Sequence, residues 1–502
     1  MMLKKFFSCF MAAAIAAAGL ITGNYSYISI DSAAADSYLS APASTDVLKE
    51  SAYVTWTPVS GADGYNVYCK PIGGSYVQLD SMLIRQYSGY FRADAVGLKP
   101  GSYVMKVVPT ADGKEDTSKA VESDAITVGS YDRSGFAFSK NSPNGGTGVG
   151  AYNDDGTLKD DAIVLYLTEE TKKTMKFDVK GSSGYVSCTG LVEILDAYSD
   201  GYDSRPLNIR IIGKVTADGV VGANSDTNNL NLKTNNTKRI VKNITIEGIG
   251  DDAVCYGFGI RGLKIQSVEI RNIGIMLFGD DGIAFETANK NIWVHNNDIF
   301  YGTAGGDADQ AKGDGSLDLK NDSQYFTISY NHFWDSGKMS LCGMKSETGE
   351  NWITYHHNWF DHSDSRHPRI RTMSVHVYNN YYDGNAKYGV GAVLDADAFV
   401  EANYFRNCKY PMLICGQGSD TGTFDDGVGA MIKSYGNYIE GAKSYITQNE
   451  SSTSFDAYEV SSRNEKVPDS VKSLDGMGYN NFDTDSSIMS VSYTHLTLPT
   501  IL

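Results

Sequence analysis

The sequence has little cysteine, little proline, a deficit of positive charge and a single long apolar run. Seven cysteines in 502 residues are too few for a disulfide scaffold, and no C-x-x-C pair is present to suggest a thiolate zinc site. The 60 acidic residues exceed the 43 Lys and Arg, so the net charge is −17. This charge argues against nucleic acid and anionic membranes as partners. H-E-x-x-H and G-x-S-x-G are also missing, so neither that type of zinc site nor a Ser-His-Asp hydrolase is indicated.

Glycine and tyrosine are abundant instead. The chain has 52 Gly and 33 Tyr against 11 Pro, which is typical of a β-rich protein with many tight turns and not of a disordered one. A length of 502 residues allows two or more domains, each with its own core.

The N-terminus has the pattern of a secretory signal. Lys4 and Lys5 precede an apolar run over 6–21, and small residues at 32–35 offer a cleavage site. Residues 1–35 are therefore predicted to be a signal peptide, with a transmembrane anchor as the alternative. No later stretch is apolar enough to span a bilayer, so the sequence predicts a secreted, extracellular protein without membrane attachment.

Residues 36–130 are predicted to form a separate small β-sandwich. Alternating apolar and polar residues surround Trp56, continue through Y-N-V-Y at 65–68, and return in L-K-P-G-S-Y-V from Leu98. This order resembles a fibronectin type III module, in which the Trp belongs to the core and the late Tyr, here Tyr103, forms a corner. Such a module could bind carbohydrate or act as a spacer, and the sequence leaves both open.

After residue 130, β-rich segments recur and end on asparagine. Successive asparagines are separated by 25, 34, 27, 22 and 23 residues. A period of roughly 24 with one fixed turn residue indicates a solenoid, because each repeat buries its apolar face only by stacking on its neighbours. Asparagine at one corner can stack as an amide ladder and tolerates left-handed backbone. The series is Asn272, Asn297, Asn331, Asn358, Asn380 and Asn403, with Asn437 as a further candidate.

A parallel β-helix over residues 131–488 explains this pattern best. Propeller blades need about 40–45 residues, and the leucine pattern of leucine-rich repeats is absent. Residues 489–502 do not fit the repeat. The peptide V-S-Y-T-H-L-T-L-P-T-I-L at 491–502 resembles translated sequencing-adapter DNA, so 489–502 is expected to be a non-native tail; a genuine terminal strand is the alternative.

The most distinctive stretch is 353–382, where two short apolar runs flank a loop with three arginines. The six-residue segment 366–371 contains Arg366, Arg369 and Arg371, although the protein as a whole is acidic. A guanidinium group donates two parallel hydrogen bonds to a carboxylate or a phosphate, so an anion-binding site is one reading. A solvated turn with scattered charge is the other.

Acidic residues lie upstream, where a complementary site would need them. Asp281 precedes the I-W-V-H segment, and Asp314 and Asp318 occur four residues apart. Residues four apart in a strand share a face, so Asp314 and Asp318 should converge, with Asp281 added from the preceding coil. Three carboxylates from adjacent coils make the hard oxygen site that Ca²⁺ requires. A row of surface aspartates in turns is the alternative.

Five histidines cluster near the arginines: His356, His357, His362, His367 and His376. The first two are adjacent in a predicted strand and should therefore point to opposite faces, where they cannot bind one ion. Core packing and hydrogen bonds to substrate or asparagine are expected instead. Cys408 and Cys415 are close enough in sequence for a local disulfide, which the sequence does not decide.

An ordered set of motifs resembles the pectate lyases of polysaccharide lyase family 1. The set comprises G-I-R-G-L-K-I-Q-S-V-E-I-R-N-I, D-D-G-I-x-F, N-I-W-V, D-G-S-L-D-L-K, T-I-S-Y-N-H-F, G-K-M-S-L-C-G, and I-T-Y-H-H-N-W-F followed by R-H-P-R-I-R and V-H-V-Y-N-N-Y-Y. Each motif is weak alone, but the order is specific. The resemblance covers about 240–410 clearly and 131–485 loosely, and it implies an all-β fold with a right-handed parallel β-helix.

The resemblance also implies roles for individual residues. Asp281, Asp314 and Asp318 match the Ca²⁺ ligands, with Asp280 beside them. The catalytic base matches Arg366, and the residues that grip substrate carboxylates match Lys338 and Arg371. Arg369 belongs to the motif without an assigned role.

Two positions depart from the family pattern. His295-Asn296 stands where the family usually has Asp-His, and Thr372-Met373 stands where a Gly usually follows the last Arg of the loop. Neither departure touches a proposed ligand or the proposed base. They leave subfamily and fine substrate preference open.

The chemistry of uronate cleavage agrees with these residues. Removing a proton from C5, which is α to a carboxylate, builds negative charge that a bound Ca²⁺ and cationic side chains stabilise. Arginine has an ordinary pKa above 12 and needs a crowded cationic site to act as a base. The spacing alone equally allows Arg366 to be an anion-binding residue.

The sequence therefore predicts a secreted, monomeric, calcium-dependent pectate lyase. It would cleave de-esterified homogalacturonan (polygalacturonate) by β-elimination to 4,5-unsaturated oligogalacturonides. A pectin lyase acting on methyl-esterified pectin, a polygalacturonase on the same fold, and a non-catalytic pectin-binding β-helix are the alternatives. A pectin lyase would need fewer acidic ligands, so the full set of aspartates disfavours it. A polygalacturonase would not need the arginine loop. A non-catalytic protein would be expected to have lost Asp314, Asp318 or Arg366, and all three are present.

Overall fold

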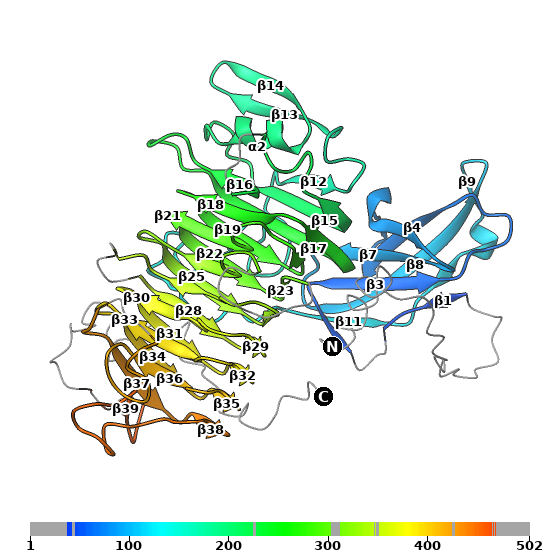
Figure 1. Cartoon of the computed structure of the whole chain (residues 1–502). Coiled ribbons are helices and arrows are strands. Elements are labelled where there is room, and N and C mark those ends of the chain that lie inside the picture. The colour runs from blue at the N-terminus through cyan, green and yellow to red at the C-terminus, as the bar shows by residue number, and fades with distance from the viewer. Residues whose placement is uncertain are drawn as a thin grey trace. The chain divides into compact units, whose positions relative to one another are not determined.

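The computed structural model describes residues 38–42, 46–223, 227–302, 312–345, 347, 351–423, 427–463, 465 and 467. The chain divides into two compact units, shown in Figure 1. The first comprises residues up to Asp132 together with Tyr152–Lys159, and the second comprises Arg133–Ala151 and the chain from Asp160. The predicted signal peptide (1–35) and the predicted tail (489–502) lie outside the described residues.

None of the helices in the described residues is both long enough and apolar enough to span a membrane.

The first unit consists of two sheets around one core. All pairings are antiparallel except that of β2 with β11. One sheet has the order β1 (Leu39–Ser40), β3 (Ser51–Trp56), β7 (Tyr90–Val96), β6 (Ile84–Tyr87). The other has the order β2 (Val47–Lys49), β11 (Ile126–Gly129), β8 (Gly101–Ala111), β4 (Gly64–Pro71), β5 (Val77–Gln78), with β9 (Lys114–Glu115) and β10 (Val121–Glu122) on β8. Single-turn helices η1 (Ser81–Leu83) and η2 (Thr117–Lys119) complete this unit.

Two aromatic residues of this unit behave as the sequence predicted. Trp56 is 2% exposed and stacks on Phe91 with ring centroids 5.7 Å apart. Tyr103 forms the expected corner, because its hydroxyl donates to the carbonyl of Lys99 at 2.9 Å. The assignment to fibronectin type III itself stays a prediction.

The second unit is a right-handed parallel β-helix in which each coil contributes strands to three rows (Figure 1). Neighbouring coils pair in parallel and in register along each row, at the spacing of about 4.8 Å that is typical of a sheet. The first row is an eight-stranded sheet, counted over the described residues: β16 (Asn229–Lys233), β18 (Gly259–Leu263), β21 (Ile283–Thr287), β24 (Leu317–Leu319), β27 (Leu341–Cys342), β30 (Arg369–Arg371), β33 (Val390–Val393) and β36 (Met412–Ile414).

The other two rows share one continuous sheet, because β15 (Leu207–Thr216) and β17 (Lys242–Tyr256) run through the corner between them and pair in both rows. The second row is β12 (Ile163–Leu167), β15 (Leu207–Thr216), β17 (Lys242–Tyr256), β19 (Gln266–Arg271), β22 (Lys290–His295), β25 (Gln324–Ser329), β28 (Ile353–His356), β31 (Ser374–Tyr378), β34 (Asp397–Glu401) and β37 (Met431–Tyr435). The third row is β20 (Gly274–Met276), β23 (Asp298–Phe300), β26 (His332–Trp334), β29 (Trp359–Asp361), β32 (Tyr381–Asp383), β35 (Tyr404–Arg406) and β38 (Tyr438–Glu440), and β39 (Tyr458–Glu459) pairs with β37.

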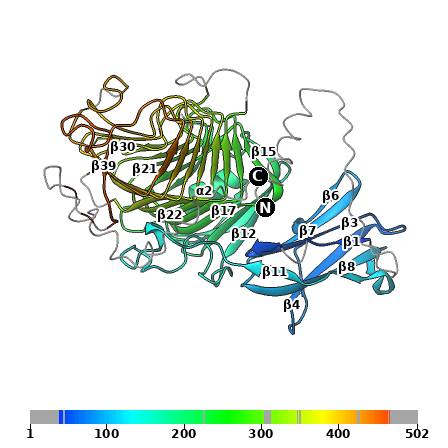
Figure 2. The ribbon, with the colours of Figure 1, turned by 90° about the horizontal axis from the view of Figure 1, so that it is seen from below.

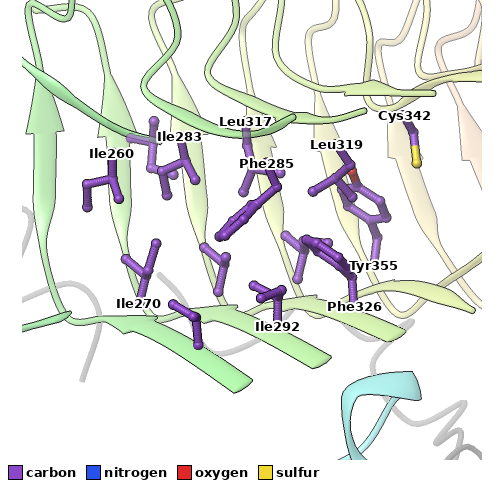
Figure 3. Close-up of a cluster of buried hydrophobic side chains, with 14 of the residues drawn as sticks. Ile260, Ile270, Ile283, Phe285, Ile292, Leu317, Leu319, Phe326, Cys342 and Tyr355 are labelled. Carbon is purple, nitrogen blue, oxygen red and sulfur yellow. The ribbon is translucent and has the colours of Figure 1, made fainter. Parts of the chain in front are cut away.

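The core of the solenoid lies between the rows. Viewed from below, the row with β21 and β30 lies opposite the row with β17 and β22 (Figure 2). Side chains at alternate strand positions point inward and stack from coil to coil, as Ile260, Ile283 and Leu317 do in Figure 3. Phe285 meets Phe326 across the core with ring centroids 5.2 Å apart. Stacking of this kind buries the apolar face that no single coil could bury alone.

The segment 133–151, with the short helix η3 (Phe136–Phe138), covers the outer face of the second row. The backbone N–H of Phe136 donates to Thr354 Oγ1 at 3.1 Å, and that of Ala151 donates to Thr245 Oγ1 at 2.8 Å. This contact explains why strands of the second row are buried on both faces, as is usual for parallel sheets. Before the regular coils come the hairpin β13 (Lys176–Gly181) and β14 (Gly184–Thr189) and the helix α2 (Leu191–Tyr198).

The predicted amide ladder is confirmed at the corner between the second and third rows. Each Asn side-chain oxygen accepts both the backbone N–H and the side-chain N–H of the Asn one coil earlier, at 2.9–3.1 Å. The ladder comprises Asn297, Asn331, Asn358, Asn380, Asn403 and Asn437.

The prediction that Asn272 belongs to this ladder is wrong. Arg271 pairs with His295, so Ile273 and not Asn272 aligns with Asn297. Asn272 instead takes the preceding corner position, where φ is positive (58°), as it is for Asn296 (54°). The left-handed residue and the ladder residue are therefore neighbours, and asparagine serves well in either position.

Replacing Asn358 by alanine is expected to lower the free energy of unfolding by about 3 kcal/mol. The change leaves the buried side-chain N–H of Asn331 and the carbonyl of Ile328 without their present partners, and each such loss costs about 1–3 kcal/mol. Asn437→Ala is the matched control, because Asn437 is half-buried at the ladder end and water can replace its bonds. Equal losses in urea unfolding of the two variants would contradict a role for burial.

Cys408 and Cys415 do not form the local disulfide that their spacing allows. In the described part of the chain both are thiols. Cys408 packs in the solenoid core, whereas Cys415 belongs to a separate cluster with Tyr388 and Leu413. The two side chains thus lie on different sides of the backbone.

Candidate active site

The residues singled out in the sequence lie on consecutive coils, just before or within first-row strands. Asp281 precedes β21, Asp314 precedes β24, Lys338 precedes β27 and Arg366 precedes β30. Backbone hydrogen bonds hold these segments in step: Asp314 N–H donates to the Asp280 carbonyl at 2.7 Å, and Ser340 N–H donates to the Arg366 carbonyl at 2.8 Å. Residues far apart in sequence are therefore brought together by coil stacking.

Three carboxylates form a compact oxygen cluster. Asp280, Asp281 and Asp314 each offer a carboxylate oxygen, and these oxygens all lie within 4.8 Å of one another. Gly315 closes against the cluster, since a Cβ there would lie 2.6 Å from Asp318 Oδ1 and 3.1 Å from Asp281 Oδ1. A pocket of carboxylate oxygens with no room for another side chain suits a hard cation such as Ca²⁺.

Asp318 joins the cluster differently from the prediction. Asp314 lies before β24 and not within it, so the alternation argument that paired it with Asp318 does not apply. Instead Lys320 links Asp318 to Asp281, with its Nζ 3.1 Å from Asp318 Oδ2 and 2.9 Å from Asp281 Oδ2. Lys320 was not singled out from the sequence, and strand alternation does not place it, because it follows the last residue of β24.

The carboxylates have perturbed pKa values because they are crowded. Burial, together with the charge of Asp318, raises the pKa of Asp281 to about 8 despite Lys320. Burial and the Asp314 charge raise the pKa of Asp280 as well. For Asp314, burial opposes ionisation, but the Lys338 ammonium outweighs it and lowers the pKa. An added cation would favour the ionised forms of Asp280 and Asp281.

The basic residues face this cluster from the next coils. The Lys338 ammonium contacts the Asp314 carboxylate, and Lys338 is 5% exposed. Arg366 has a left-handed backbone (φ 67°), which costs roughly 1–2 kcal/mol in a non-glycine residue and often marks a functional position. The Arg366 charge also helps to lower the pKa of Asp314. Acidic and basic groups are thereby placed side by side.

Arg369 and Arg371 extend the basic group along β30. They flank the buried Ile370, so both point away from the core on the same face. Burial raises the pKa of the Tyr388 hydroxyl to about 12, and the charges of Arg369, Arg366 and Arg371 oppose that rise. All three guanidinium charges therefore act on Tyr388, which packs in a cluster with Val393 and Leu413 outside the solenoid core.

The expectation that the rings of His356 and His357 point apart is wrong. Their Nδ1 atoms are hydrogen-bonded at 2.8 Å, because His357 follows the last residue of β28 and its positive φ (53°) ends the alternation. His367 and His376 are buried: His367 Nδ1 bonds the Tyr388 carbonyl at 2.6 Å, and burial lowers its pKa to about 4. His376 Nε2 bonds Glu401 at 2.6 Å. These two histidines are packed within the solenoid, as predicted, but their partners are a backbone carbonyl and a glutamate instead of the expected substrate or asparagine.

Known proteins resemble part of this chain. The family profile described as "Pectate lyase" matches residues 121–480. A pectate trisaccharide-lyase from Bacillus licheniformis is 31% identical over 225 residues, which cover 44% of this chain and 62% of that protein. Pectate lyase 3 from Pectobacterium carotovorum is 36% identical over 196 residues, 38% of this chain and 52% of that protein. The chain thus matches less than two thirds of these relatives' lengths.

A solved structure shows a related but distant likeness. A pectate lyase from Bacillus sp. N165 in complex with trigalacturonate superposes with a TM-score of 0.45 at 25% identity, over 61% of this chain and 87% of that one. The profile match alone covers well over half of the chain and includes every acidic and basic residue described above. The chain belongs to the pectate lyase family.

Proposed function

We propose that this protein is a secreted, calcium-dependent pectate lyase that cleaves de-esterified homogalacturonan by β-elimination. The observation that supports this most directly is the stacking of an aspartate cluster against Lys338 and Arg366 on successive coils. Membership of the pectate lyase family supports the reaction class. Export rests on the signal-like residues 1–35, and a monomer acting alone on the polysaccharide is part of the same proposal.

Asp281 and Asp314 are proposed to hold the calcium ion together with Asp280, and Asp318 completes the set from β24. When bound, calcium neutralises the substrate carboxylate and stabilises the enolate-like charge that develops on it. Lys338 and Arg371 are proposed to grip neighbouring uronate carboxylates, for which guanidinium and ammonium groups are suited.

Arg366 is proposed to take the C5 proton of the bound uronate. The electron pair of the C5–H bond becomes the C4–C5 double bond, the C4–O4 bond breaks, and the leaving O4 takes up a proton. Products are one new reducing end and one 4,5-unsaturated end. The left-handed backbone conformation of Arg366 supports this role. Such strained conformations are found mainly at functional sites, and this one gives the side chain a direction different from that of a residue in an extended strand.

Ultraviolet absorbance during incubation with polygalacturonate tests the proposal. A rise in absorbance that chelation abolishes is expected, because only elimination creates the conjugated double bond. Reducing ends without an absorbance rise would indicate hydrolysis. Activity restricted to methyl-esterified pectin, or binding without any product, would contradict the proposal in favour of the other two alternatives.

A further inference from the structure

Glu347 is a buried carboxylate that collects four hydrogen bonds from three consecutive coils. It is 4% exposed. Its Oε1 accepts the backbone N–H groups of Asn321 and Met344, both at 2.8 Å. Its Oε2 accepts the backbone N–H of Lys345 at 3.0 Å and the hydroxyl of Thr372 at 2.6 Å. These four donors are uncharged groups of the chain itself.

Two of the donors directly follow residues of the candidate site. Asn321 follows Lys320, which bonds Asp281 and Asp318, and Thr372 follows Arg371 at the end of β30. Glu347 therefore bonds Asn321 and Thr372, which lie just after β24 and β30, the strands that carry Asp318 and Arg371. Fixing Asn321 and Thr372 fixes where those two strands end.

The coil between them is packed tightly against its neighbour. At Gly343 a Cβ would lie 1.9 Å from the carbonyl oxygen of Arg371, and φ is positive (94°). Glycine is therefore required at 343 for the close approach to the Arg371 backbone. The next two residues, Met344 and Lys345, then donate their backbone N–H groups to Glu347.

We propose that Glu347 is a positioning residue that sets the Arg371 guanidinium and the Lys320 ammonium in place for substrate and metal binding. The inference rests on the proposed function, because it takes Arg371 as a grip for uronate carboxylates. A carboxylate bonds backbone N–H groups more strongly than a neutral side chain does. Hydrogen bonds from Thr372 and the backbone keep the pKa of Glu347 low although burial would raise it. When a group that positions substrate is displaced by about 1 Å, the reaction rate can fall by about 10²-fold.

Glu347→Gln is expected to raise KM for polygalacturonate about 10-fold while kcat changes less than about threefold. Weakened binding without a change in the reacting groups has this signature. Thr372→Val should give the same split through loss of one donor, and Thr372→Ser, which keeps the hydroxyl, should restore wild-type KM. In Glu347→Gln/Arg371→Ala the loss of substrate binding should be smaller than the sum of the two single losses, because part of the Glu347 effect acts through Arg371.

Asp456→Asn is the matched control for lost stability. Asp456 is also a fully buried carboxylate that accepts backbone N–H groups, from Ser419 at 2.9 Å and Ile446 at 2.8 Å, but it lies before β39. Its Tm should fall without a change in KM. An equal KM increase in Asp456→Asn, or a lowered Tm with unchanged KM in Glu347→Gln, would overturn the inference and leave Glu347 a structural residue.

The same variants separate failure of this inference from failure of the proposed function. Wild-type elimination, and a KM effect of Arg371→Ala, test the proposed function without Glu347. Calorimetric binding of trigalacturonate to Arg366→Ala and to Glu347→Gln/Arg366→Ala, which should turn over very slowly, reports positioning apart from catalysis, and about 10-fold weaker binding is expected in the double variant. A wild-type protein that neither binds nor cleaves would overturn both.

Discussion

Replacing Arg366 by alanine is expected to lower kcat on polygalacturonate by about 10³-fold with little change in KM. A positioned base contributes typically 10²–10⁴-fold, and the Lys338 and Arg371 contacts that bind substrate remain in the variant. The Asp280, Asp281 and Asp314 cluster is also unchanged, so calcium binding should persist. Initial rates of ultraviolet absorbance change, together with calorimetric titration of calcium, check both parts of this expectation.

Arg406→Ala is the control for removing an arginine from the solenoid. Its side chain is 46% exposed and belongs to the third row, whereas the Asp280, Asp281 and Asp314 cluster lies beside the first row. Activity should therefore stay within about twofold of wild type. Arg366→Lys keeps the charge but not the planar fork and should also be impaired. A raised KM with wild-type kcat in Arg366→Ala would instead make Arg366 an anion-binding residue, the reading that the spacing in the sequence left open.

Calcium is expected to raise Tm more at pH 8 than at pH 5, and chelation is expected to abolish activity. The pKa of Asp281 is raised to about 8 in the folded protein, above its ordinary value. For a carboxyl of this kind the stabilising contribution is present below the unfolded pKa of about 4 and is lost as pH rises through about 8. The metal-free protein is therefore weakened toward pH 8, where calcium finds ionised ligands. At 100 times its Kd, calcium should stabilise the fold by about 2.7 kcal/mol.

Asp281→Asn tests whether this pH dependence comes from the cluster. The variant should lose most of the calcium-dependent gain in Tm and should lose activity at least about 10²-fold. Asp196→Asn is the control, because Asp196 lies on α2 with its side chain 60% exposed and pairs with Lys233. Differential scanning calorimetry with calcium and with chelator, at both pH values, measures the effect. An unchanged calcium response in Asp281→Asn would exclude the cluster as the binding site.

The fold was predicted from a local pattern, the recurrence of asparagine at the ends of β-rich segments. The recurring asparagines predicted the solenoid because each amide must bond to the next coil, and the structure has this ladder from Asn297 to Asn437. The same pattern misled at Asn272, since both positions of the two-residue corner accept asparagine and only the strand register distinguishes them. A single sequence carries no information on that register.

The order of motifs along the chain, and so the family, could be read from the sequence by itself. The sequence also singled out Asp281, Asp314 and Arg366, whose roles stay proposals. Which groups touch was decided only by tertiary structure, because it depends on how coils of unequal length stack. The ion pair of Lys320 with Asp281 and the hydrogen bond of Thr372 to Glu347 join different coils, and no local spacing encodes them. Residue types and periodicity are local properties of the chain, whereas contacts and pKa shifts arise from the packed neighbours of each side chain.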